Sequence, residues 1–424
     1  MRIVRVGLAG LGTVGFGTYA VLTENAQEIT ARTGTKIEVR CAVVRDAEKA
    51  RQKTGGKLPI ETSFLALLED PLIDIVVEVM GGIEPAKTFV LEAIKRGKHV
   101  VTANKHLIAV HGEEIFRAAR QQGVTVAYEA AVAGGIPIIK ALRESLAGNR
   151  IESVSGIVNG TSNYILSMMR EKGSSFSEAL CEAQKLGYAE ADPTFDIEGI
   201  DAAHKTTILA SLAFGTPFNF NAASIEGITS IDAQDIAFAE KLGYCIKLIG
   251  QAKRTQAGIE LGVHPRLVSQ KSLFSRIDGV MNAVEVVADG LGPTFYAGRG
   301  AGERPTASAV VADIMDVART MNAEPSARVA MAGFQLESRQ AIPYVAASKI
   351  QSRFYVRFSK DDEPIVREAF DDSSIVVEQS RQFGDQTIAF VKKVEIGILD
   401  AALQIVSKNS SIHGSPIRLH VFDS

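Results

Sequence analysis

The feature that most constrains the fold is a glycine turn between an apolar strand and a helix near the N-terminus. Residues 3–9 (IVRVGLA) predict a buried strand, Gly10, Gly12 and Gly15 form the pattern Gly-x-Gly-x-x-Gly, and a helix follows. These glycines permit a tight turn and let a pyrophosphate approach backbone N–H groups at a helix N-terminus. A plain strand-to-helix turn is the alternative, but the flanking elements favour dinucleotide binding.

Alternating strands and helices continue to about residue 130. Strands are predicted at 36–44, 74–80, 99–103 and 125–130, with helices at 85–97 and 111–123. Because these strands are apolar throughout, they predict a parallel sheet covered on both faces. The predicted class is α/β. It comprises a Rossmann-like, doubly wound domain at 1–130 and a mixed α/β domain at 131–340, whose helical segment at 310–340 packs back on the first. A linker at 340–349 and a small α+β unit at 350–424 follow.

Composition and charge narrow the function classes. A chain of 424 residues is too long for one core, so two or three domains are expected. The net charge of -3 gives no basic footprint, so nucleic acid is not an expected partner. Cys41, Cys181 and Cys245 lack disulfide or metal spacing, which indicates a reducing compartment, here the cytoplasm. No apolar run approaches the roughly 20 residues of a membrane span, and no signal peptide is recognised.

The end of the second strand bears on cofactor choice. An NAD site usually places an acidic residue there, whereas this chain has Arg45 followed by Asp46. A guanidinium suits a 2′-phosphate, so NADP is preferred and NAD stays open. The alternative is an exposed loop arginine.

Five carboxylates precede a single lysine in an apolar helix. They are Glu190, Asp192, Asp196, Glu198 and Asp201, and the lysine is Lys205. Asp201 and Lys205 are four residues apart and share a helix face. A solvated surface pair is the alternative, but the apolar flanks favour a partly buried ammonium with acidic partners. Such a site suits a ligand that carries an ammonium group and a carbonyl or hydroxyl.

A second lysine follows the fourth predicted strand. Lys105 stands where strand ends of an open α/β sheet face the ligand crevice, although a surface lysine is the commoner case. His99, His106 and His204 could act as acids or bases by residue type, but nothing in their spacing indicates a metal site, and histidine catalysis is not favoured.

Several motifs together resemble one family. GLGTVG, TANK, YEAAVAGGIPII, NGTSNYIL, GYAEADPTFDIEGIDAAHK and GRGAGERPTASAVVADI look like homoserine dehydrogenase of the monofunctional type, from residue 1 to about 340. The resemblance implies reversible, NAD(P)H-dependent reduction of L-aspartate 4-semialdehyde to L-homoserine. It also implies a homodimer formed by the middle domain, with a tetramer left open.

The resemblance also implies roles for individual residues. Lys205 would donate the proton to the carbonyl oxygen, and Lys105 would assist this transfer or bind cofactor and substrate. Glu190 and Asp201 would bind the substrate's amino end, with Asp196 in support. The cofactor would lie against Gly10, Leu11, Gly12, Thr13, Val14, Gly15, Arg45, Lys105, Gly187 and Gly302.

In the family, the segment YEAAVAGGIPII folds around a monovalent cation, usually Na⁺. By position, the ligands here would be Glu129 and the backbone carbonyls of Val132, Gly134 and Ile136. One carboxylate with carbonyls suits a hard cation. A glycine-rich hinge between domains is an equally good interpretation of the residues.

The C-terminal unit resembles an ACT domain, a βαββαβ module that often binds an amino-acid effector. The family's proline-glycine after the first strand is Pro364-Ile365 here, and only ten residues separate Pro364 from Ile375. This spacing predicts a shortened first helix, and a structural or dimer-bracing role competes with effector binding.

Two other functions compete with this interpretation. Aspartate-semialdehyde dehydrogenase needs a cysteine nucleophile, and none of the three cysteines is predicted on a turn. A catalytically silent NADP-binding sensor is the second, and the presence of Lys105, Glu190, Asp201 and Lys205 argues against it.

Overall fold

A computed structural model of the chain describes residues 2–339 and 341–423. Met1, Gln340 and Ser424 lie outside the described residues, and Gln340 is the first residue of the expected linker. The chain forms two compact units. The first comprises the chain up to Val154, Thr207–Phe220 and Asn282–Ala341, and the second comprises Ser155–Thr206, Asn221–Met281 and the chain from Ile342.

A parallel sheet of six strands forms the centre of the first unit. The strands are β1 (Arg2–Ala9), β2 (Thr35–Val43), β3 (Ile60–Glu61), β4 (Ile75–Glu78), β5 (His99–Thr102) and β6 (Val126–Ala127). Their order is β3-β2-β1-β4-β5-β6, and every pairing is parallel. This is the doubly wound order, whose switch point lies between β1 and β4. The predicted Rossmann-like fold is confirmed.

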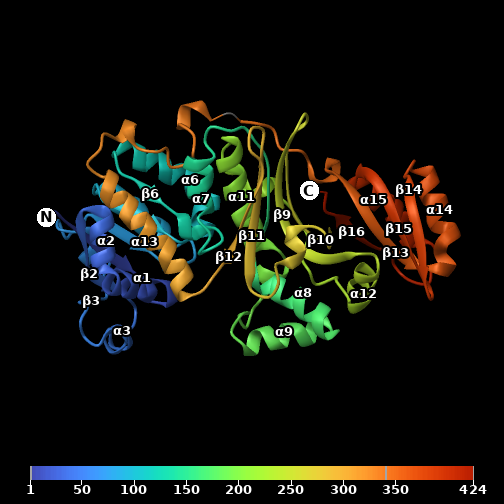
Figure 1. The fold of residues 1–424 in the computed structure, drawn as a ribbon, viewed down its shortest axis with the longest axis horizontal. Helices are drawn as coiled ribbons and strands as arrows, with labels where there is room; N and C mark the ends of the chain where they lie inside the picture. Colours follow the sequence, from blue (N-terminus) through green and yellow to red (C-terminus); the bar gives the residue numbers. More distant parts are fainter. Residues whose placement is uncertain (1, 340, 424) are drawn as a thin grey trace. The chain divides into compact units, whose positions relative to one another are not determined.

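Helices cover this sheet, and one of them comes from a distant part of the chain. They are α1 (Thr13–Glu24), α2 (Ala26–Thr33), α3 (Ala47–Thr54), α4 (Leu65–Leu68), α5 (Ala86–Lys95), α6 (Lys105–Gln121), α7 (Ile138–Lys140) and α13 (Glu303–Thr320). Figure 1 shows α13 beside α1 and α2. A side chain at Gly17 would lie 2.7 Å from the Glu303 carbonyl oxygen, so this glycine allows α1 and α13 to pack closely. Val310, Ile314 and Val317 of α13 join the core formed by β1, β2 and β4.

The chain passes between units within β7 (Ile151–Ile157) and β11 (Met281–Ala288), and β12 (Gly292–Arg299) belongs to the first unit. The second unit contains α8 (Gly160–Lys172), α9 (Phe176–Lys185), α10 (Thr194–Ile197), β8 (Ser224–Ile225), α12 (Ala233–Lys241), β9 (Tyr244–Thr255) and β10 (Gly258–Ser269). Helix α11 (Ile200–Phe214) begins in this unit. β9 and β10 form an antiparallel pair along their full length, and β8 joins β10 in parallel.

The C-terminal residues of the second unit alternate strands and helices. The elements are β13 (Gln351–Ser359), α14 (Glu363–Asp372), β14 (Val377–Phe383), β15 (Gln386–Glu395), α15 (Ile396–Lys408) and β16 (Ile417–Val421). The strands run in the order β10-β16-β13-β15-β14, so the C-terminal module continues the sheet of β9 and β10. Its core joins Phe354 and Val356 of β13 to Val366 and Phe370 of α14 and to Leu399 of α15.

None of the helices that the structure describes combines the length and hydropathy needed to cross a bilayer.

Candidate active site

The glycine turn has the geometry that pyrophosphate binding needs. Gly10 has φ +108°, and a side chain there would lie 2.9 Å from the Val79 carbonyl oxygen. A side chain at Gly15 would lie 2.2 Å from the carbonyl oxygen of Gly10, whereas the space beside Gly12 is open. Two glycines therefore close the turn, and the middle one leaves room for a ligand beside the first turn of α1. Leu11 is buried, while Thr13 is exposed and Val14 partly buried at the start of α1.

Arg45 and Asp46 have different roles at the end of β2. Asp46 caps α3, because its Oδ1 accepts a 3.0 Å hydrogen bond from the Lys49 N–H. Arg45 is exposed at the strand tip. A second cation, Lys53, lies here and was not predicted from the sequence: its Nζ lies 3.5 Å from the Gly12 carbonyl oxygen and 4.3 Å from the Phe16 ring centroid. The only sequence signal for it is the basic last turn of α3.

Lys105 is the first residue of α6, at the carboxyl end of β5. Asn104 fixes this turn: its Oδ1 accepts from the Leu107 N–H at 3.1 Å, and its Nδ2 donates to the Gly82 carbonyl at 2.6 Å. Buried Glu78 supports the neighbouring strand end by accepting from Thr102 Oγ1 at 2.6 Å and from the Met80 N–H at 2.8 Å. Lys105 therefore starts from a rigid strand-to-helix turn.

Glu129 is buried, and its carboxylate is already occupied. Its two oxygens accept from the Ile139 N–H at 2.9 Å and the Lys140 N–H at 2.7 Å, at the start of α7. Burial raises the pKa of Glu129 to about 7, although both N–H bonds favour the ionised form. The Glu129 N–H donates to Asp313 at 2.7 Å, and burial raises the pKa of that carboxyl well above its usual value.

The loop after Glu129 turns its carbonyls sharply. Ala133 and Gly134 have φ of +53° and +46°, and a side chain at Gly134 would lie 2.3 Å from the Gly300 carbonyl oxygen. The Ile136 carbonyl accepts from the Ile138 N–H at 2.8 Å. Among the described residues, the carbonyls of Val132 and Gly134 accept no such backbone bond. Two of the four expected cation ligands therefore have spare acceptor capacity, while the Glu129 side chain serves the α7 N-terminus.

Lys205 and two carboxylates meet in the second unit. Lys205 Nζ donates to Asp201 Oδ2 and to the Val158 carbonyl, both at 2.7 Å, and the two side chains are only 14% and 6% exposed. Asn159 Nδ2 donates to Asp201 Oδ2 at 2.8 Å and to Asp196 Oδ1 at 2.7 Å. Burial and the nearby charge of Asp201 raise the pKa of Asp196. The expected partly buried ammonium with acidic partners is present.

The other carboxylates of this segment lie apart from the pair. Glu190 is exposed, and its backbone carbonyl accepts from Gln184 Nε2 at 3.1 Å. Gly187 is exposed with φ +74°. Asp192 caps its own turn through Thr194, whose hydroxyl donates at 2.6 Å. The structure thus brings Asp196 and Asp201 together through Asn159, which the sequence analysis did not single out, and leaves Glu190 on the surface of the same unit.

Two family models match the chain in order. One, described as homoserine dehydrogenase, NAD binding domain, matches residues 10–129, and the other, described as homoserine dehydrogenase, matches residues 137–315. The homoserine dehydrogenase of Neisseria gonorrhoeae is 55% identical over 364 residues, which are 86% of this chain and 83% of the relative. The chain belongs to the homoserine dehydrogenase family. The resemblance stated from the motifs is confirmed, and with it the enzyme class, an NAD(P)-dependent oxidoreductase.

Solved structures of homoserine dehydrogenases agree with this assignment. One from Thiobacillus denitrificans has a TM-score of 0.96 at 50% identity and covers 100% of this chain and 99% of its own. One from Staphylococcus aureus has a TM-score of 0.79 at 32% identity, with both chains fully covered. A hyperthermophilic archaeal homoserine dehydrogenase in complex with NADPH covers 74% of this chain and 97% of its own, at 28% identity and a TM-score of 0.64.

The cysteines give no support to a thiol-dependent dehydrogenase. Cys41 and Cys245 are buried, and burial raises the pKa of both thiols. Cys181 is exposed on α9. A catalytic nucleophile would need a lowered pKa in a polar site.

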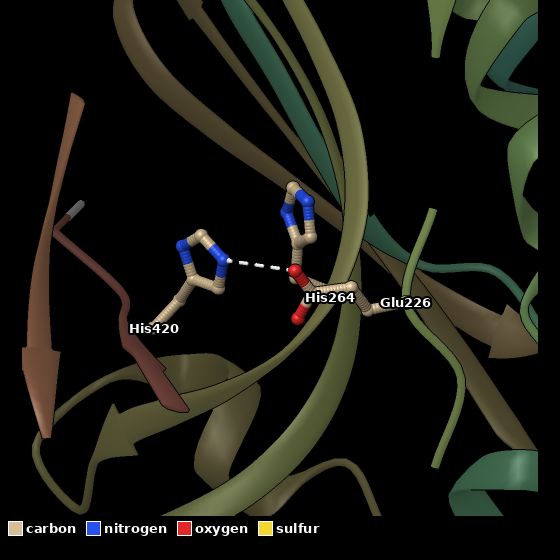
Figure 2. A group of neighbouring side chains, drawn as sticks. All are labelled: Glu226, His264 and His420. Atoms are coloured by element: carbon tan, nitrogen blue, oxygen red, sulfur yellow. Dashed lines mark ion pairs between the residues drawn. The ribbon is translucent and has the colours of Figure 1, made fainter. Parts of the chain in front are cut away.

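A second polar cluster of the second unit has the residue types of a metal site. Glu226, His264 and His420 offer ligand atoms within 4.8 Å of one another, and the two rings stack at 4.1 Å (Figure 2). Arg418 already donates to both Glu226 oxygens, at 2.8 and 3.1 Å. His264 Nε2 bonds Ser224 at 2.9 Å, and its Nδ1 faces buried Arg266 at 3.4 Å. The two guanidiniums, and the hydrogen bonds that Glu226 and His264 already make, favour a structural ion-pair network over a cation.

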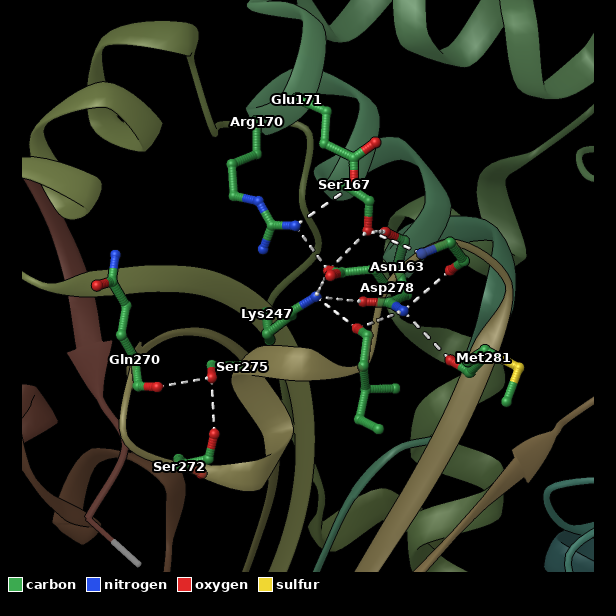
Figure 3. Close-up of polar contacts among 12 residues, drawn as sticks. Asn163, Ser167, Arg170, Glu171, Lys247, Gln270, Ser272, Ser275, Asp278 and Met281 are labelled. Carbon is green, nitrogen blue, oxygen red and sulfur yellow. Dashed lines mark hydrogen bonds and ion pairs between the residues drawn. The ribbon is translucent and has the colours of Figure 1, made fainter.

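A third cluster surrounds buried Lys247. Its Nζ donates to Asp278 at 2.8 Å, to the Ile277 carbonyl at 2.6 Å and to Asn163 Oδ1 at 3.2 Å. Asn163 in turn donates to the carbonyls of Ile277, Gly279 and Met281, as Figure 3 shows. Lys247 Nζ and the Asn163 amide thus bond mainly to backbone carbonyls of the 277–281 segment and to the Asp278 carboxylate. This cluster therefore fixes the 277–281 turn against α8.

Proposed function

We propose that the chain catalyses the reversible, NAD(P)H-dependent reduction of L-aspartate 4-semialdehyde to L-homoserine, with Lys205 as the proton donor. The observation that carries the proposal is the buried ammonium of Lys205 beside Asp201 in a chain of the homoserine dehydrogenase family. Lys205 Nζ has three N–H groups, and two of them are held by Asp201 and Val158. The third is the donor for a substrate oxygen.

The chemistry divides between cofactor and protein. The nicotinamide supplies or accepts the hydride at the substrate carbon. As hydride adds to the carbonyl carbon, negative charge develops on the oxygen, and the Lys205 ammonium neutralises it by proton transfer. In the direction of oxidation, neutral Lys205 takes the proton of the homoserine hydroxyl. Asp201 and the Val158 carbonyl hold Nζ in one position, which limits the reorganisation that proton transfer requires.

The acidic residues are proposed to bind the ammonium group of the substrate. Asp196 and Asp201 supply negative charge in a partly buried setting, where an ion pair is stronger than in water. Glu190 is exposed and extends from the loop after Gly187. We assign it to the outer part of the substrate site.

NADP is proposed as the preferred cofactor, with NAD as the alternative. Arg45 is exposed at the tip of β2, and Lys53 adds a second cation beside Gly12. Both suit a 2′-phosphate. Gly302, with φ +119°, opens α13 and is assigned to the cofactor with the glycine turn, Leu11, Thr13 and Val14. Lys105, which follows the end of β5, is assigned to contacts with the cofactor and the substrate.

The loop from Glu129 to Ile136 is proposed to hold a monovalent cation, Na⁺ by resemblance. The spare carbonyls of Val132 and Gly134 support this, and the Glu129 side chain would act by fixing the loop and supplying nearby negative charge. A carbonyl cage suits a hard cation. The cation would add rigidity to this loop.

The remaining proposals concern assembly and location. The β-α-β-β-α-β order after residue 350 supports an ACT-like module, whose first helix α14 has ten residues. We propose a homodimer, with a tetramer as the alternative, in the cytoplasm, where the three free cysteines stay reduced.

Oxidation of L-homoserine at alkaline pH tests the proposed function, with reduced nicotinamide as the readout. NADP and NAD are compared in parallel, and threonine is the added variable. Turnover that favours NADP supports the proposal, and threonine insensitivity supports a structural role for the ACT-like module. Cofactor binding without any turnover contradicts the proposed reaction.

A further inference from the structure

Asn159 stands at the junction between β7 and α8 and contacts both carboxylates of the site. Its Oδ1 caps α8 by accepting from the Ser162 N–H at 2.8 Å. Its Nδ2 divides its two hydrogens between Asp196 Oδ1, at 2.7 Å, and Asp201 Oδ2, at 2.8 Å. The side chain is buried. The Asn159 amide has one orientation here, because a flipped amide would place its oxygen against two carboxylates.

The preceding residue completes the arrangement. The Val158 carbonyl accepts from Lys205 Nζ, and Asp201 Oδ2 accepts from both Lys205 and Asn159. The β7–α8 junction therefore touches the lysine directly and touches its carboxylate partner through one amide. A displacement of this junction would change the position of Nζ.

We propose that Asn159 is a positioning residue, which holds Asp196 and Asp201 side by side as carboxylates and thereby fixes the Lys205 ammonium. The inference rests on the proposed role of Lys205. It goes further because the negative charge of Asp196 and Asp201, which would bind the substrate's ammonium group, then depends on Asn159. Asn159 is a neutral amide that touches no reacting atom.

The physical basis is repulsion between like charges in a partly buried place. Burial and the charge of Asp201 raise the pKa of Asp196, and the hydrogen bond from Asn159 is the largest of the effects that oppose this shift, followed by the charge of Lys205 and a hydrogen bond from Thr161. Without the shared NH₂ group, one carboxyl of the pair would hold a proton to higher pH. The substrate's ammonium would then meet less negative charge, and its affinity would fall at neutral pH and recover at higher pH.

Two variants remove the NH₂ group and keep the helix cap. Asn159→Ser retains a hydroxyl oxygen for the Ser162 N–H, and Asn159→Asp is isosteric and retains the oxygen while adding a charge. Asn163→Ser is the matched control, because Asn163 lies on the same helix and its amide donates only to backbone carbonyls. Thermal unfolding separates loss of stability from the effect on the site.

The measurement is kcat/KM for L-homoserine between about pH 6 and about pH 9. Calorimetric binding of L-homoserine to the NADPH complex, in which no hydride can be transferred, is a second readout. We expect the acidic limb of the kcat/KM profile to move to higher pH by about one pH unit in Asn159→Ser, and by more in Asn159→Asp. Asn163→Ser should keep the wild-type limb. A wild-type limb in both Asn159 variants, or the same pH-independent loss in all three, overturns the proposal.

Failure of the proposed function gives a different result. If Lys205→Ala keeps wild-type turnover, the role of Lys205 is wrong, whatever the Asn159 variants show. If Lys205→Ala loses turnover and the Asn159 limb stays in place, only the positioning role is wrong. The binding readout keeps the test decisive where an Asn159 variant turns over too slowly for kinetics.

Discussion

Lys205 Nζ lies 2.7 Å from Asp201 Oδ2, one helical turn earlier on α11, and the Lys205 and Asp201 side chains are only 14% and 6% exposed. An exposed pair at this spacing contributes a few tenths of a kcal/mol, roughly. A buried pair with further hydrogen bonds is different, because removal of one partner leaves the other charge unpaired. This relationship gives the helix a fixed ammonium at the proposed site of proton transfer.

Asp201→Asn should weaken substrate binding. The amide oxygen can still accept from Lys205 and Asn159, but the negative charge is lost. KM for L-homoserine should rise about 10- to 100-fold, the usual worth of a hydrogen bond to a charged group, with a fall in kcat. Steady-state kinetics measure both. Asp192→Asn is the control, since Asp192 caps only its own turn. A wild-type KM in Asp201→Asn would argue against ammonium binding by this residue.

Arg45→Ala should reduce the preference for NADP. A charge-assisted hydrogen bond to phosphate is worth about 1.5–3 kcal/mol, so the ratio of kcat/KM for NADP and NAD should fall about 10- to 100-fold. Arg51→Ala, in the last turn of α3, is the matched control. Lys53→Ala should give a smaller fall in the same direction. An unchanged ratio in Arg45→Ala would remove this residue from cofactor choice.

Much of this site architecture follows from the sequence, and the reasons are specific. The strands β4 and β5 and the second half of β1 are buried on both faces, so they appear as apolar runs. β3 spans only Ile60–Glu61, too short for any pattern. Helix α6 was predicted from 111 but begins at Lys105, because Asn104 caps it six residues earlier. The catalytic lysine candidate of the first unit therefore lies on a helix, not in the preceding loop.

In the acidic segment before Lys205, the sequence predicts some of the contacts and not others. The five carboxylates before α11 predicted acidic partners for Lys205. The spacing of Asp201 and Lys205 correctly predicted their contact. The partner that joins Asp196 to Asp201 lies 37 and 42 residues earlier in the chain. Asn159 looks like an ordinary helix cap in the sequence, and only the fold shows that its second polar group faces two carboxylates. Exposure of Glu190 depends likewise on the path of the loop before α10.

The stability of the first unit should fall as pH rises from about 4.5 to about 7 when no cation is bound. Glu129 has a pKa raised to about 7 from 4.5, so its contribution is present below about pH 4.5 and lost as pH rises through about 7. The loss is about 3 kcal/mol. Thermal unfolding in tetramethylammonium buffers should show this slope. It should be smaller in Glu129→Gln, and Glu144→Gln should resemble wild type.

Sodium should oppose that loss if the loop binds it, because a nearby cation favours the ionised carboxylate. Added Na⁺ should raise the unfolding temperature most at the alkaline end, and K⁺ serves as the comparison cation. An equal effect of Na⁺ and tetramethylammonium would contradict the proposed cation site.

The second unit should lose stability in acid. Burial lowers the pKa of His420 to about 4 and that of His264 well below its usual value, with Glu226, Arg266 and Arg418 around them. A lowered histidine pKa makes stability fall as pH drops from about 6.5 to about 4, by about 3 kcal/mol for His420. Denaturant unfolding should show this slope. It should be flatter in His420→Gln, while His111→Gln, a partly exposed histidine, should match wild type.

The most direct test of the account is turnover of Lys205→Ala. L-homoserine oxidation is followed through the reduced nicotinamide that it forms, and NADP affinity is measured by calorimetry. The account predicts a fall in kcat of about 10²- to 10⁴-fold, the usual range for general acid–base catalysis, with unchanged NADP affinity. Lys172→Ala, an exposed lysine paired with Glu182, should behave as wild type. A kcat in Lys205→Ala within about twofold of wild type would contradict proton transfer by Lys205.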